Sequence, residues 1–299
     1  MTATRALILG CGYVGGRLAR ALAADGVSVT GTTRDPARFA AIAAAGATPA
    51  RMDAMEPATL DAVLADRPDV VFDCIRPLRT GPDAFTVENT RRIVDALVAH
   101  RPGAVVYVSS TSVYGRRAGE WTDEETPLDP VSPAGLSRAE AERLYFAAFR
   151  DAGLPARVCR VPGIYGPGRT LRGRLETGAY LRLDDESHHV SRIHVDDLVA
   201  GLLASWRRGV PGGVYLLCDD RPVSGAEYAE ITARLLGIPL PTAVARADIR
   251  HELTSSAWER RTADRRCSNR RMRLELGVAL RYPTVHQGVP AALAEEGAI

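Results

Sequence analysis

Three glycines near the amino end have the spacing of a phosphate-binding turn. The stretch ALILGCGYVGGRLARAL carries Gly10, Gly12 and Gly15 between a strand-like run and a helix-like run. In that context the first glycine allows a tight turn, the second admits a pyrophosphate to the backbone, and the third lets helix and strand pack closely. The helix start supplies unpaired N–H groups and partial positive charge. We expect a dinucleotide cofactor here rather than an unliganded turn, with further contacts from Cys11, Tyr13 and Val14.

Residues at the end of the next strand-like run indicate which dinucleotide is bound. NAD-binding sites usually place an acid about 20 residues after the glycines, against the ribose hydroxyls. This chain has Thr33 and Arg34 there, and an arginine can bind a 2′-phosphate through two hydrogen bonds. These residues favour NADP(H) over NAD(H), unless Asp35 takes the ribose. Asp53 could accept a hydrogen bond from the adenine amino group, or could only cap the segment after it.

Alternating apolar runs and helix-like stretches predict the elements that must position these residues. The expected strands are 6–10, 28–33, 69–74, 104–110 and 156–161, followed by 213–220. This alternation predicts an α/β fold with a doubly wound parallel sheet of the Rossmann type. We expect residues 1–165 to form the cofactor-binding domain, with 193–218 returning to it. Residues 166–192 and 219–299 are expected to form a smaller C-terminal substrate lobe over the carboxyl edge of the sheet.

Composition excludes several other classes of function. The net charge of +2 gives no electrostatic reason to expect a nucleic-acid or membrane partner, and no apolar run reaches 18 residues. Five dispersed cysteines without CxxC spacing favour reduced thiols in the cytoplasm over disulfides or a metal site. All 38 basic residues other than histidine are arginine, so lysine chemistry is excluded. We therefore expect a cytoplasmic protein that acts on a small molecule.

Further segments resemble the extended short-chain dehydrogenase/reductases, also called NAD-dependent epimerase/dehydratases. The similar stretches are VVYVSSTSVYG (105–115), VCRVPGIYGPG (158–168) and SRIHVDDLVAGL (191–202), together with Asn89. The resemblance implies that Ser110 orients a substrate carbonyl or hydroxyl group. It also implies cofactor contacts from Cys74 and Pro162, at the ends of two expected strands. Many relatives dimerise through two helices, so a homodimer is an expectation by analogy.

The chain departs from this family at the catalytic helix. The family pattern P-Y-G-x-S-K-x-x-x-E contains a tyrosine that transfers a proton and a lysine that binds the nicotinamide ribose. Here the segment runs from Pro133 to Glu142, with Ala134 in the tyrosine position and Arg138 in the lysine position. Arg138 can keep the positive charge and the ribose contact, but alanine has no proton to transfer. The departure resembles an atypical subgroup of the family.

Other residues are candidates for the missing chemistry or for substrate binding. Tyr165, in GIYGPG, could supply a proton, although packing is the alternative, and Thr111 could extend a hydroxyl relay from Ser110. Tyr145 is 11 residues after Ala134, about 16 Å along a helix, which favours core packing. Substrate contacts are expected from the vacated position and from an arginine-rich segment suited to an anion, namely Ala134, Arg169, His189 and Arg192.

Three functions are compatible with these residues. The first is an NADP(H)-dependent oxidoreductase that acts on a small, possibly anionic, carbonyl or hydroxyl substrate without the usual tyrosine and lysine. An epimerase is disfavoured within this hypothesis, because it must deprotonate and reprotonate the same oxygen. The second is a non-catalytic NADP-sensing module, which explains the lost pair directly. The third is a non-redox lyase or isomerase that uses the same pocket.

Overall fold

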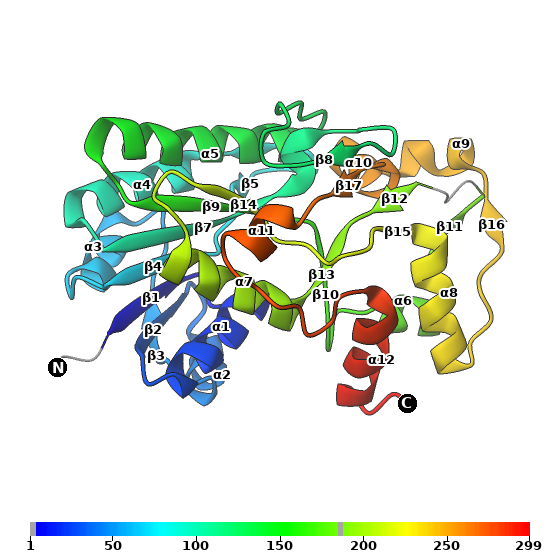
Figure 1. Ribbon diagram of the computed structural model, residues 1–299, viewed down its shortest axis with the longest axis horizontal. Coiled ribbons are helices and arrows are strands. Elements are labelled where there is room, and N and C mark those ends of the chain that lie inside the picture. Colours follow the sequence, from blue (N-terminus) through cyan, green and yellow to red (C-terminus); the bar gives the residue numbers. More distant parts are fainter. Residues whose placement is uncertain (1–3, 185–187) are drawn as a thin grey trace. The chain divides into compact units, whose positions relative to one another are not determined.

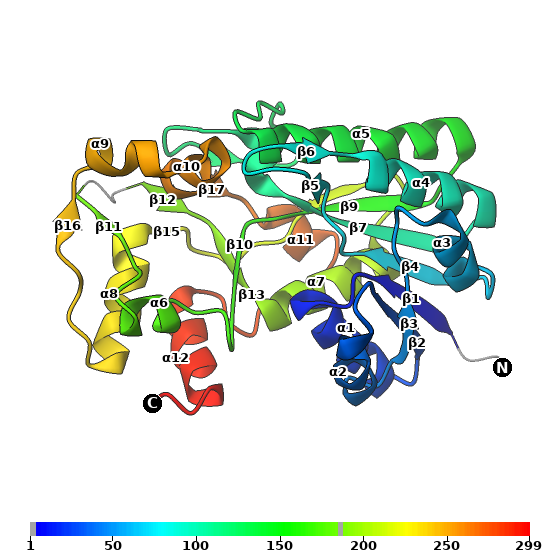
Figure 2. The same cartoon turned by 180° about the vertical axis from the view of Figure 1, so that it is seen from behind.

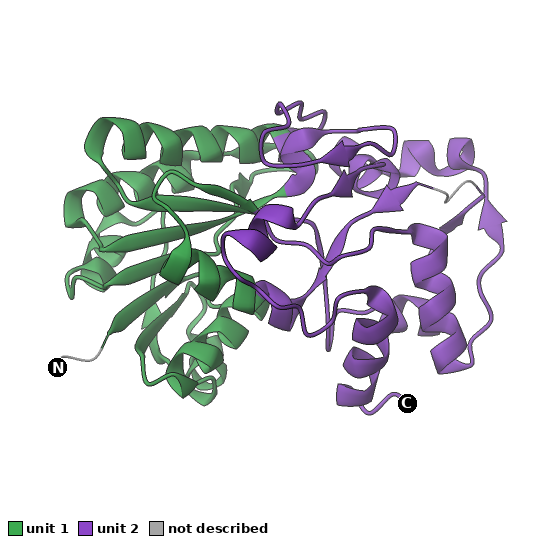
Figure 3. Ribbon diagram, in the orientation of Figure 1, with its two compact units in different colours: residues 1–110, 136–160, 199–215 green, residues 111–135, 161–198, 216–299 purple. Residues whose placement is uncertain are grey.

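The computed structural model describes residues 4–184 and 188–299, and Figures 1 and 2 show its helices and strands from two sides. The chain divides into two compact units, coloured separately in Figure 3. Unit 1 comprises residues 1–110, 136–160 and 199–215. Unit 2 comprises residues 111–135, 161–198 and 216–299.

Unit 1 is built on a seven-stranded sheet in the order β14-β9-β7-β4-β1-β2-β3. The strands are β1 (Arg5–Leu9), β2 (Ser28–Thr33), β3 (Thr48–Arg51), β4 (Val70–Asp73), β7 (Ala104–Ser110), β9 (Ala156–Val161) and β14 (Val214–Leu216). β1 pairs in parallel with both β2 and β4, and β4 pairs in parallel with β7. The strand order reverses at β1, which is the point where open α/β sheets bind ligands. The predicted doubly wound α/β fold is confirmed.

Helices cover both faces of this sheet (Figures 1 and 2). One face carries α3 (Pro57–Leu64), α4 (Glu88–His100) and most of α5 (Pro133–Ala152), and the other carries α1 (Tyr13–Ala24), α2 (Phe39–Ala44) and most of α7 (Val195–Arg208). On the first face, Leu7, Leu9 and Val71 of the strands pack with Ile93 of α4 and Tyr145 of α5 in one buried cluster. Strands buried on both faces need near-continuous apolar sequence, which is why their positions are clear from the sequence alone.

The edge strand β3 was not predicted. It has only four residues, none of them buried, and Pro49 interrupts its apolar pattern. Proline in a sheet is confined largely to edge strands, where the missing N–H is tolerated. A hairpin of β5 (Leu78–Arg79) and β6 (Phe85–Thr86) and the short η1 (Pro36–Arg38) complete unit 1.

Unit 2 consists of short strands and helices. Its strands are β8 (Trp121–Thr122), β10 (Gly163–Tyr165), β11 (Arg182–Leu183), β12 (His189–Val190), β13 (Arg192–His194), β15 (Val223–Ser224), β16 (Ala243–Val244) and β17 (Arg266–Cys267). Its helical segments are η2 (Thr111–Tyr114), α6 (Arg172–Glu176), α8 (Gly225–Leu236), α9 (Arg246–Ile249), η3 (Arg250–Glu252), α10 (Ser255–Thr262), α11 (Arg270–Leu274) and α12 (Val285–Glu295). β10 pairs with β13, and Tyr165, Tyr228 and Val289 belong to the apolar cluster packed between α8 and α12.

The division differs from the predicted boundaries most at residues 111–135, and it also places residues 161–165, 193–198 and 216–218 in unit 2. Residues 111–135 were expected in the cofactor-binding domain but cluster with unit 2. β8 pairs with β17, and Arg265 donates a hydrogen bond to the Gly115 carbonyl, 150 residues earlier. Such pairing between distant segments leaves no local pattern in the sequence. Among residues 4–184 and 188–299, no helix has the length and hydropathy needed to cross a membrane.

Candidate functional site

The glycine loop of unit 1 joins β1 to α1. Gly10 has a φ of +82°, and a Cβ there would lie 2.9 Å from Ile75 Cγ1, so this position requires glycine. Thr32 of β2 holds the loop from below: its Oγ1 accepts from the Gly10 N–H at 3.0 Å and its carbonyl accepts from the Cys11 N–H at 2.7 Å. Thr32 is fully buried, so its side chain holds the loop in place and is not exposed to a cofactor. Residues after Thr32 are therefore the candidates for distinguishing NAD(H) from NADP(H).

Gly12 and Gly15 have different surroundings. A Cβ at Gly15 would lie 2.7 Å from the Gly10 carbonyl oxygen, so glycine is needed for loop and helix to pack. A Cβ at Gly12 would meet no atom closer than that same oxygen at 4.0 Å, so protein packing does not explain this glycine. Gly12 caps α1, which has no side-chain cap and no acid in its first turn. This open cradle of helix N–H groups fits a pyrophosphate.

The neighbouring loop residues lie where the sequence predicted. Cys11 is buried between the glycines, and burial raises the pKa of its thiol while Arg38 lowers it. Tyr13 and Val14 open α1 and are partly exposed. No sequence motif pointed to Arg38, which acts on Cys11 from η1, four residues after Arg34.

Thr33 ends β2, and Arg34 follows it directly. Thr33 Oγ1 accepts from the Asp35 N–H at 3.2 Å, and Asp35 Oδ1 caps η1 by accepting from the Ala37 N–H at 3.0 Å. The Asp35 carboxylate is thus engaged locally. Arg34 is exposed and forms no ion pair with any residue that the structure describes. Two guanidinium groups, Arg34 and Arg38, therefore follow β2 where an NAD site usually has an acid.

Asp53 and Cys74 follow two other strands of the sheet. Asp53 is partly exposed, and its Oδ1 accepts from the Met55 N–H at 2.9 Å, which supports the capping interpretation of that residue. Cys74 follows β4 directly, and its N–H donates to the Leu9 carbonyl at 3.0 Å. Burial raises the pKa of the Cys74 thiol far above its usual range, so this group stays protonated.

Arg138, on α5, is fixed against β7. Its Nη1 donates to the Val108 carbonyl at 2.9 Å and to the Tyr107 hydroxyl at 3.3 Å. Its Nε and Nη2 have no hydrogen bond to any described residue. An arginine in the lysine position is thus held rigidly by one nitrogen while two others stay available. The phenol beside this cation, Tyr107, comes from β7 and not from α5, and no sequence motif singled it out.

Tyr107 and Tyr145 form a buried stacked pair, and Tyr145 is hydrogen-bonded to Asp73. Their rings stack with centroids 4.5 Å apart, and Tyr145 donates to Asp73 Oδ2 at 2.6 Å. Burial raises the pKa of Asp73 to about 6, although the Tyr145 hydroxyl and the Ile75 N–H both stabilise the ionised form. Burial also raises the pKa of Tyr107 to about 12. Because both phenols are fully buried, they support Arg138 and the sheet and do not replace the missing proton donor.

A buried ion pair lies one turn further along α5. Glu142 accepts from Arg160 of β9 at 2.8 Å and from the Ser109 hydroxyl at 2.5 Å. Glu142 is fully buried and Arg160 is 4% exposed. This network ties the helix that carries Arg138 to β7 and β9. Its role is to hold the helix in position.

The predicted catalytic hydroxyls lie at a strand end. Ser110 is the last residue of β7 and is partly exposed, while Thr111 begins η2 and is buried. Pro162 links β9 to β10. Ala134 lies in the first turn of α5, where its N–H donates to the Ser256 hydroxyl of unit 2 at 3.2 Å. The helix start is thus preserved without the phenol.

Tyr165 is enclosed by the core of unit 2. It is 2% exposed, its hydroxyl donates to the Thr284 carbonyl at 3.4 Å, and a Cβ at Gly288 would come within 2.1 Å of that hydroxyl. Burial raises the pKa of Tyr165 far above its usual range. These contacts support the packing interpretation of Tyr165 over proton transfer.

The predicted substrate residues of unit 2 have distinct environments. His189 lies near Asp264, with its N–H donating to Oδ1 at 2.7 Å and its Nδ1 3.4 Å from the same oxygen. Arg169 is exposed after β10. Arg192 is partly buried on β13, and its guanidinium carbon lies 4.1 Å above the Tyr228 ring. Within the described ranges, no group of three or more histidine, cysteine or acidic residues is arranged to hold a metal ion.

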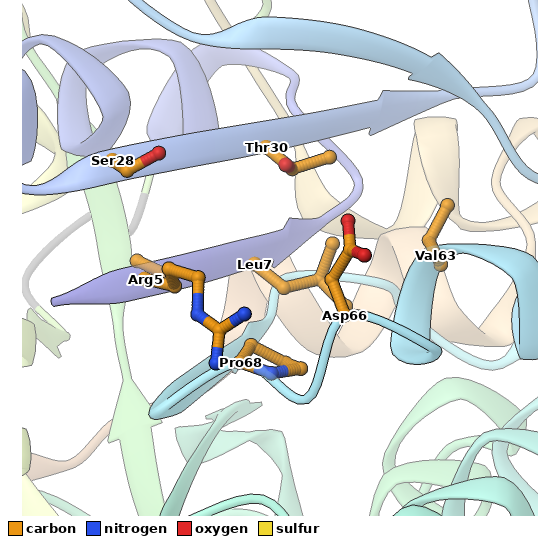
Figure 4. Close-up of a pocket in the computed structure, with 8 residues that line it drawn as sticks. Arg5, Leu7, Ser28, Thr30, Val63, Asp66 and Pro68 are labelled. Carbon is orange, nitrogen blue, oxygen red and sulfur yellow. The ribbon is translucent and has the colours of Figure 1, made fainter. Parts of the chain in front are cut away.

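A small cavity of about 80 Å³ lies elsewhere in unit 1 (Figure 4). It opens at the amino ends of β1 and β2, where Arg5 and Asp66 line it together with Ser28 and Thr30. The glycine loop follows the carboxyl end of β1, at the other edge of the sheet. This cavity is too small for a nucleotide and plays no part in the cofactor site.

Comparison with known proteins agrees with the glycine loop and the sheet. The chain is 30% identical to Protein YeeZ of Escherichia coli (strain K12) over 92% of this chain and 95% of that protein. It is 30% identical to the 3-diazoavenalumate denitrifying reductase of a Streptomyces species, over 95% of this chain and 99% of that one. A functionally unknown conserved protein from Silicibacter pomeroyi DSS has a similar solved structure, with 35% identity, a TM-score of 0.84, and coverage of 98% and 99%. Residues 6–218 match the model of the NAD dependent epimerase/dehydratase family, and the chain belongs to that family.

Proposed function

We propose that this protein is an NADP(H)-dependent oxidoreductase that reduces or oxidises a small carbonyl or hydroxyl substrate without the family's tyrosine and lysine. The observation that carries the proposal is the glycine loop, whose open Gly12 cradle is followed by Arg34 and Arg38 after β2. A relative named as a reductase, matched along nearly its whole length, supports reduction over epimerisation.

The coenzyme preference rests on the charge that follows β2. A 2′-phosphate carries about two negative charges, which Arg34 and Arg38 can neutralise. The Asp35 carboxylate, which could otherwise bind a ribose diol, is engaged in capping η1. The arrangement therefore favours NADP(H) over NAD(H).

Replacing Arg34 tests this preference. Arg34→Ala is expected to weaken NADPH binding roughly 10- to 100-fold, the loss of one or two charge-assisted hydrogen bonds, and to leave NADH binding within about twofold. Fluorescence titration with each coenzyme measures both constants. The matched control is Arg20→Ala, an exposed arginine on α1, which should change neither. Equal losses for NADPH and NADH in Arg34→Ala would contradict the 2′-phosphate assignment.

The chain's own residues can support hydride transfer in the absence of the phenol. When bound, the nicotinamide supplies or accepts the hydride. Arg138, held by Val108 and Tyr107, offers Nε and Nη2 to a ribose hydroxyl, and its charge stabilises negative charge nearby. Ser110 donates to the substrate oxygen, as in the family. General acid catalysis is typically worth about 10²–10⁴ in rate, so a slow reaction remains possible with water as the proton source.

Position 134 tests where the substrate oxygen lies. Ala134→Phe is expected to reduce turnover at least about 100-fold, because the ring would fill the space that alanine leaves at the family's tyrosine position. NADPH binding should stay within about twofold. Coenzyme oxidation in a screen of carbonyl substrates gives the rate, and fluorescence titration gives the affinity. Full turnover in Ala134→Phe would mean that this space is not part of the catalytic site.

A second candidate function is a non-catalytic NADP-binding module. The absence of a phenol at Ala134 favours it, because alanine has no proton to transfer to a substrate. The same coenzyme titration separates the candidates when followed by the carbonyl screen. NADPH-selective binding with no coenzyme oxidation by any carbonyl compound would favour the binding module over the oxidoreductase.

A further inference from the structure

Unit 2 contains a cation and an acid that the coenzyme site does not use. Arg192 of β13 pairs in register with Gly163 of β10, where a Cβ would lie 3.6 Å from the Arg192 Cγ. The glycine leaves space beside the arginine side chain. The guanidinium lies over the Tyr228 ring, and the Asp219 N–H donates to the Arg192 carbonyl at 2.8 Å. Gly163, Arg192, Asp219 and Tyr228 form what we call the Arg192 cluster.

The guanidinium of Arg192 is only partly engaged. Its Nη1 donates to the Val190 and Val223 carbonyls at 3.2 and 3.3 Å. Its Nε and Nη2 make no hydrogen bond to any described residue, and no carboxylate of those residues lies within ion-pair distance. Burial lowers the pKa of Arg192, but a guanidinium keeps its proton in proteins. A partly buried, stacked guanidinium with Nε and Nη2 still able to donate can recognise a planar anion.

Asp219 is the internal acid of this cluster. It is 1% exposed, and neither carboxyl oxygen has a well-formed hydrogen bond among the described residues. Burial raises the pKa of Asp219 to about 8, while the Arg192 charge and the backbone N–H groups of Arg192 and Arg221 lower it and Asp220 raises it. The other titratable groups that interact with Asp219 are Tyr165, Cys218 and Cys267, each of which is neutral near pH 7 because burial raises its pKa.

The Arg192 guanidinium can therefore be neutralised either by the Asp219 carboxylate or by an external anion. Above about pH 8, when no ligand is bound, ionised Asp219 compensates the Arg192 charge. When an external anion binds Arg192, two negative charges would share one buried cation, which is costly at low dielectric. Protonation of Asp219 relieves that cost. A monoanionic carboxylate then balances the cluster, whereas a phosphate dianion would leave it with a net negative charge.

We propose that the Arg192 cluster is a carboxylate-binding subsite in which Asp219 is protonated when the ligand is bound. Ligand binding near pH 8 and above therefore takes up a proton. The inference rests on the proposed function, because it assigns the substrate of that reaction to the carbonyl compounds that carry a carboxylate. Arg192 binds the carboxylate through Nε and Nη2, with Tyr228 holding the guanidinium plane. Asp219 is a positioning residue that sets the charge of the cluster.

Acetate binding without coenzyme tests the subsite by itself. Isothermal titration calorimetry with acetate, in two buffers of different ionisation enthalpy, gives both the affinity and the number of protons taken up. Acetate is expected to bind about tenfold more weakly at pH 9 than at pH 7, and to take up about half a proton at pH 8. Acetamide, the neutral isostere of acetate, should not bind, and inorganic phosphate should bind more weakly than acetate.

Variants identify the residues responsible. Arg192→Gln should weaken acetate binding at least about tenfold, and Asp219→Asn should make it independent of pH with no proton uptake. Arg234→Gln, on the exposed side of the helix that carries Tyr228, is the matched control and should match the wild-type protein. Circular dichroism checks folding, and the proton uptake of the wild-type protein needs no variant.

The outcomes separate this inference from the proposed function. No acetate binding, binding unaffected by Arg192→Gln, or wild-type binding without pH dependence would each overturn the subsite. Tighter, Arg192-dependent binding of phosphate would overturn the carboxylate assignment. NADPH titration of Arg192→Gln runs beside these measurements and should match the wild-type protein. Loss of coenzyme binding in the wild-type protein, with acetate binding intact, would instead count against the proposed function alone.

Discussion

Gly12→Ala is expected to abolish coenzyme binding without unfolding the protein. A methyl group there would meet no protein atom closer than 4.0 Å, so the free energy of unfolding should change by no more than about 1 kcal/mol. The same methyl group would occupy the open face that a pyrophosphate needs to reach the α1 N–H groups. We expect NADPH affinity to fall about 100-fold or more, which corresponds to about 3 kcal/mol.

The control is the same substitution four residues further along the chain. A Cβ at Gly16 meets nothing within 4 Å, and alanine is a better helix former than glycine by about 1 kcal/mol. Gly16→Ala should therefore bind NADPH as the wild-type protein does and unfold at the same or a higher temperature. Fluorescence titration and thermal unfolding of both variants provide the measurements. Undiminished NADPH binding in Gly12→Ala would remove the loop from the coenzyme site.

Glu142→Ala should be among the most destabilising single substitutions in unit 1. It leaves the Arg160 charge, 4% exposed, without its carboxylate, and breaking a buried ion pair costs about 3–5 kcal/mol. Urea unfolding should show this loss in the free energy of unfolding. The helix that carries Arg138 should also loosen, so weaker NADPH binding is expected in the folded fraction.

An exposed ion pair on the same helix is the matched control. Glu140 pairs with Arg143 in solvent, where such pairs contribute about 0–1 kcal/mol. Glu140→Ala should therefore change stability little. The double variant Glu142→Leu/Arg160→Met should regain most of the stability lost in Glu142→Ala, since it removes both charges. A Glu142→Ala protein as stable as Glu140→Ala would show that burial does not set the strength of the Glu142–Arg160 pair.

Family membership narrows the function without choosing a reaction. The chain belongs to the NAD dependent epimerase/dehydratase family, whose sheet and glycine loop it retains. Helix α5 has a cation at Arg138 and the buried acid Glu142, but Ala134 stands where the family pattern has a phenol. Arg138 binds the Val108 carbonyl of β7, and Glu142 pairs with Arg160 of β9. Both side chains therefore hold α5 against the sheet, a role that does not need the phenol.

Local signals account for the parts that sequence could predict. Gly10 and Gly15 are required by backbone conformation and close packing, Gly12 leaves the start of α1 open, and all three lie within six residues. β1, β4 and β7 are largely apolar runs. β3 escaped prediction because an edge strand needs no buried side chains. The membership of residues 111–135 in unit 2 escaped it because β8 pairs with β17, far along the chain.

For the candidate site residues, the sequence shows the type of side chain, and only the structure shows its surroundings. The sequence identified Arg34 and Arg192 as cations but gave no surroundings for either. Arg34 is exposed beyond β2, whereas Arg192 is stacked on Tyr228 beside an acid 27 residues away. The sequence left two interpretations of Tyr165 open, proton transfer or packing. The contacts with α12, which only the tertiary structure shows, favour packing.

The sequence by itself determined the α/β fold, the glycine loop and the missing phenol, because each depends on residues close together in the chain. Tertiary structure decided what the remaining polar side chains can do. Tyr107 beside Arg138, Tyr145 beside Asp73, and Asp219 behind Arg192 are brought together from distant segments. Burial then sets their charge, because desolvation disfavours ionisation by an amount that no local pattern encodes.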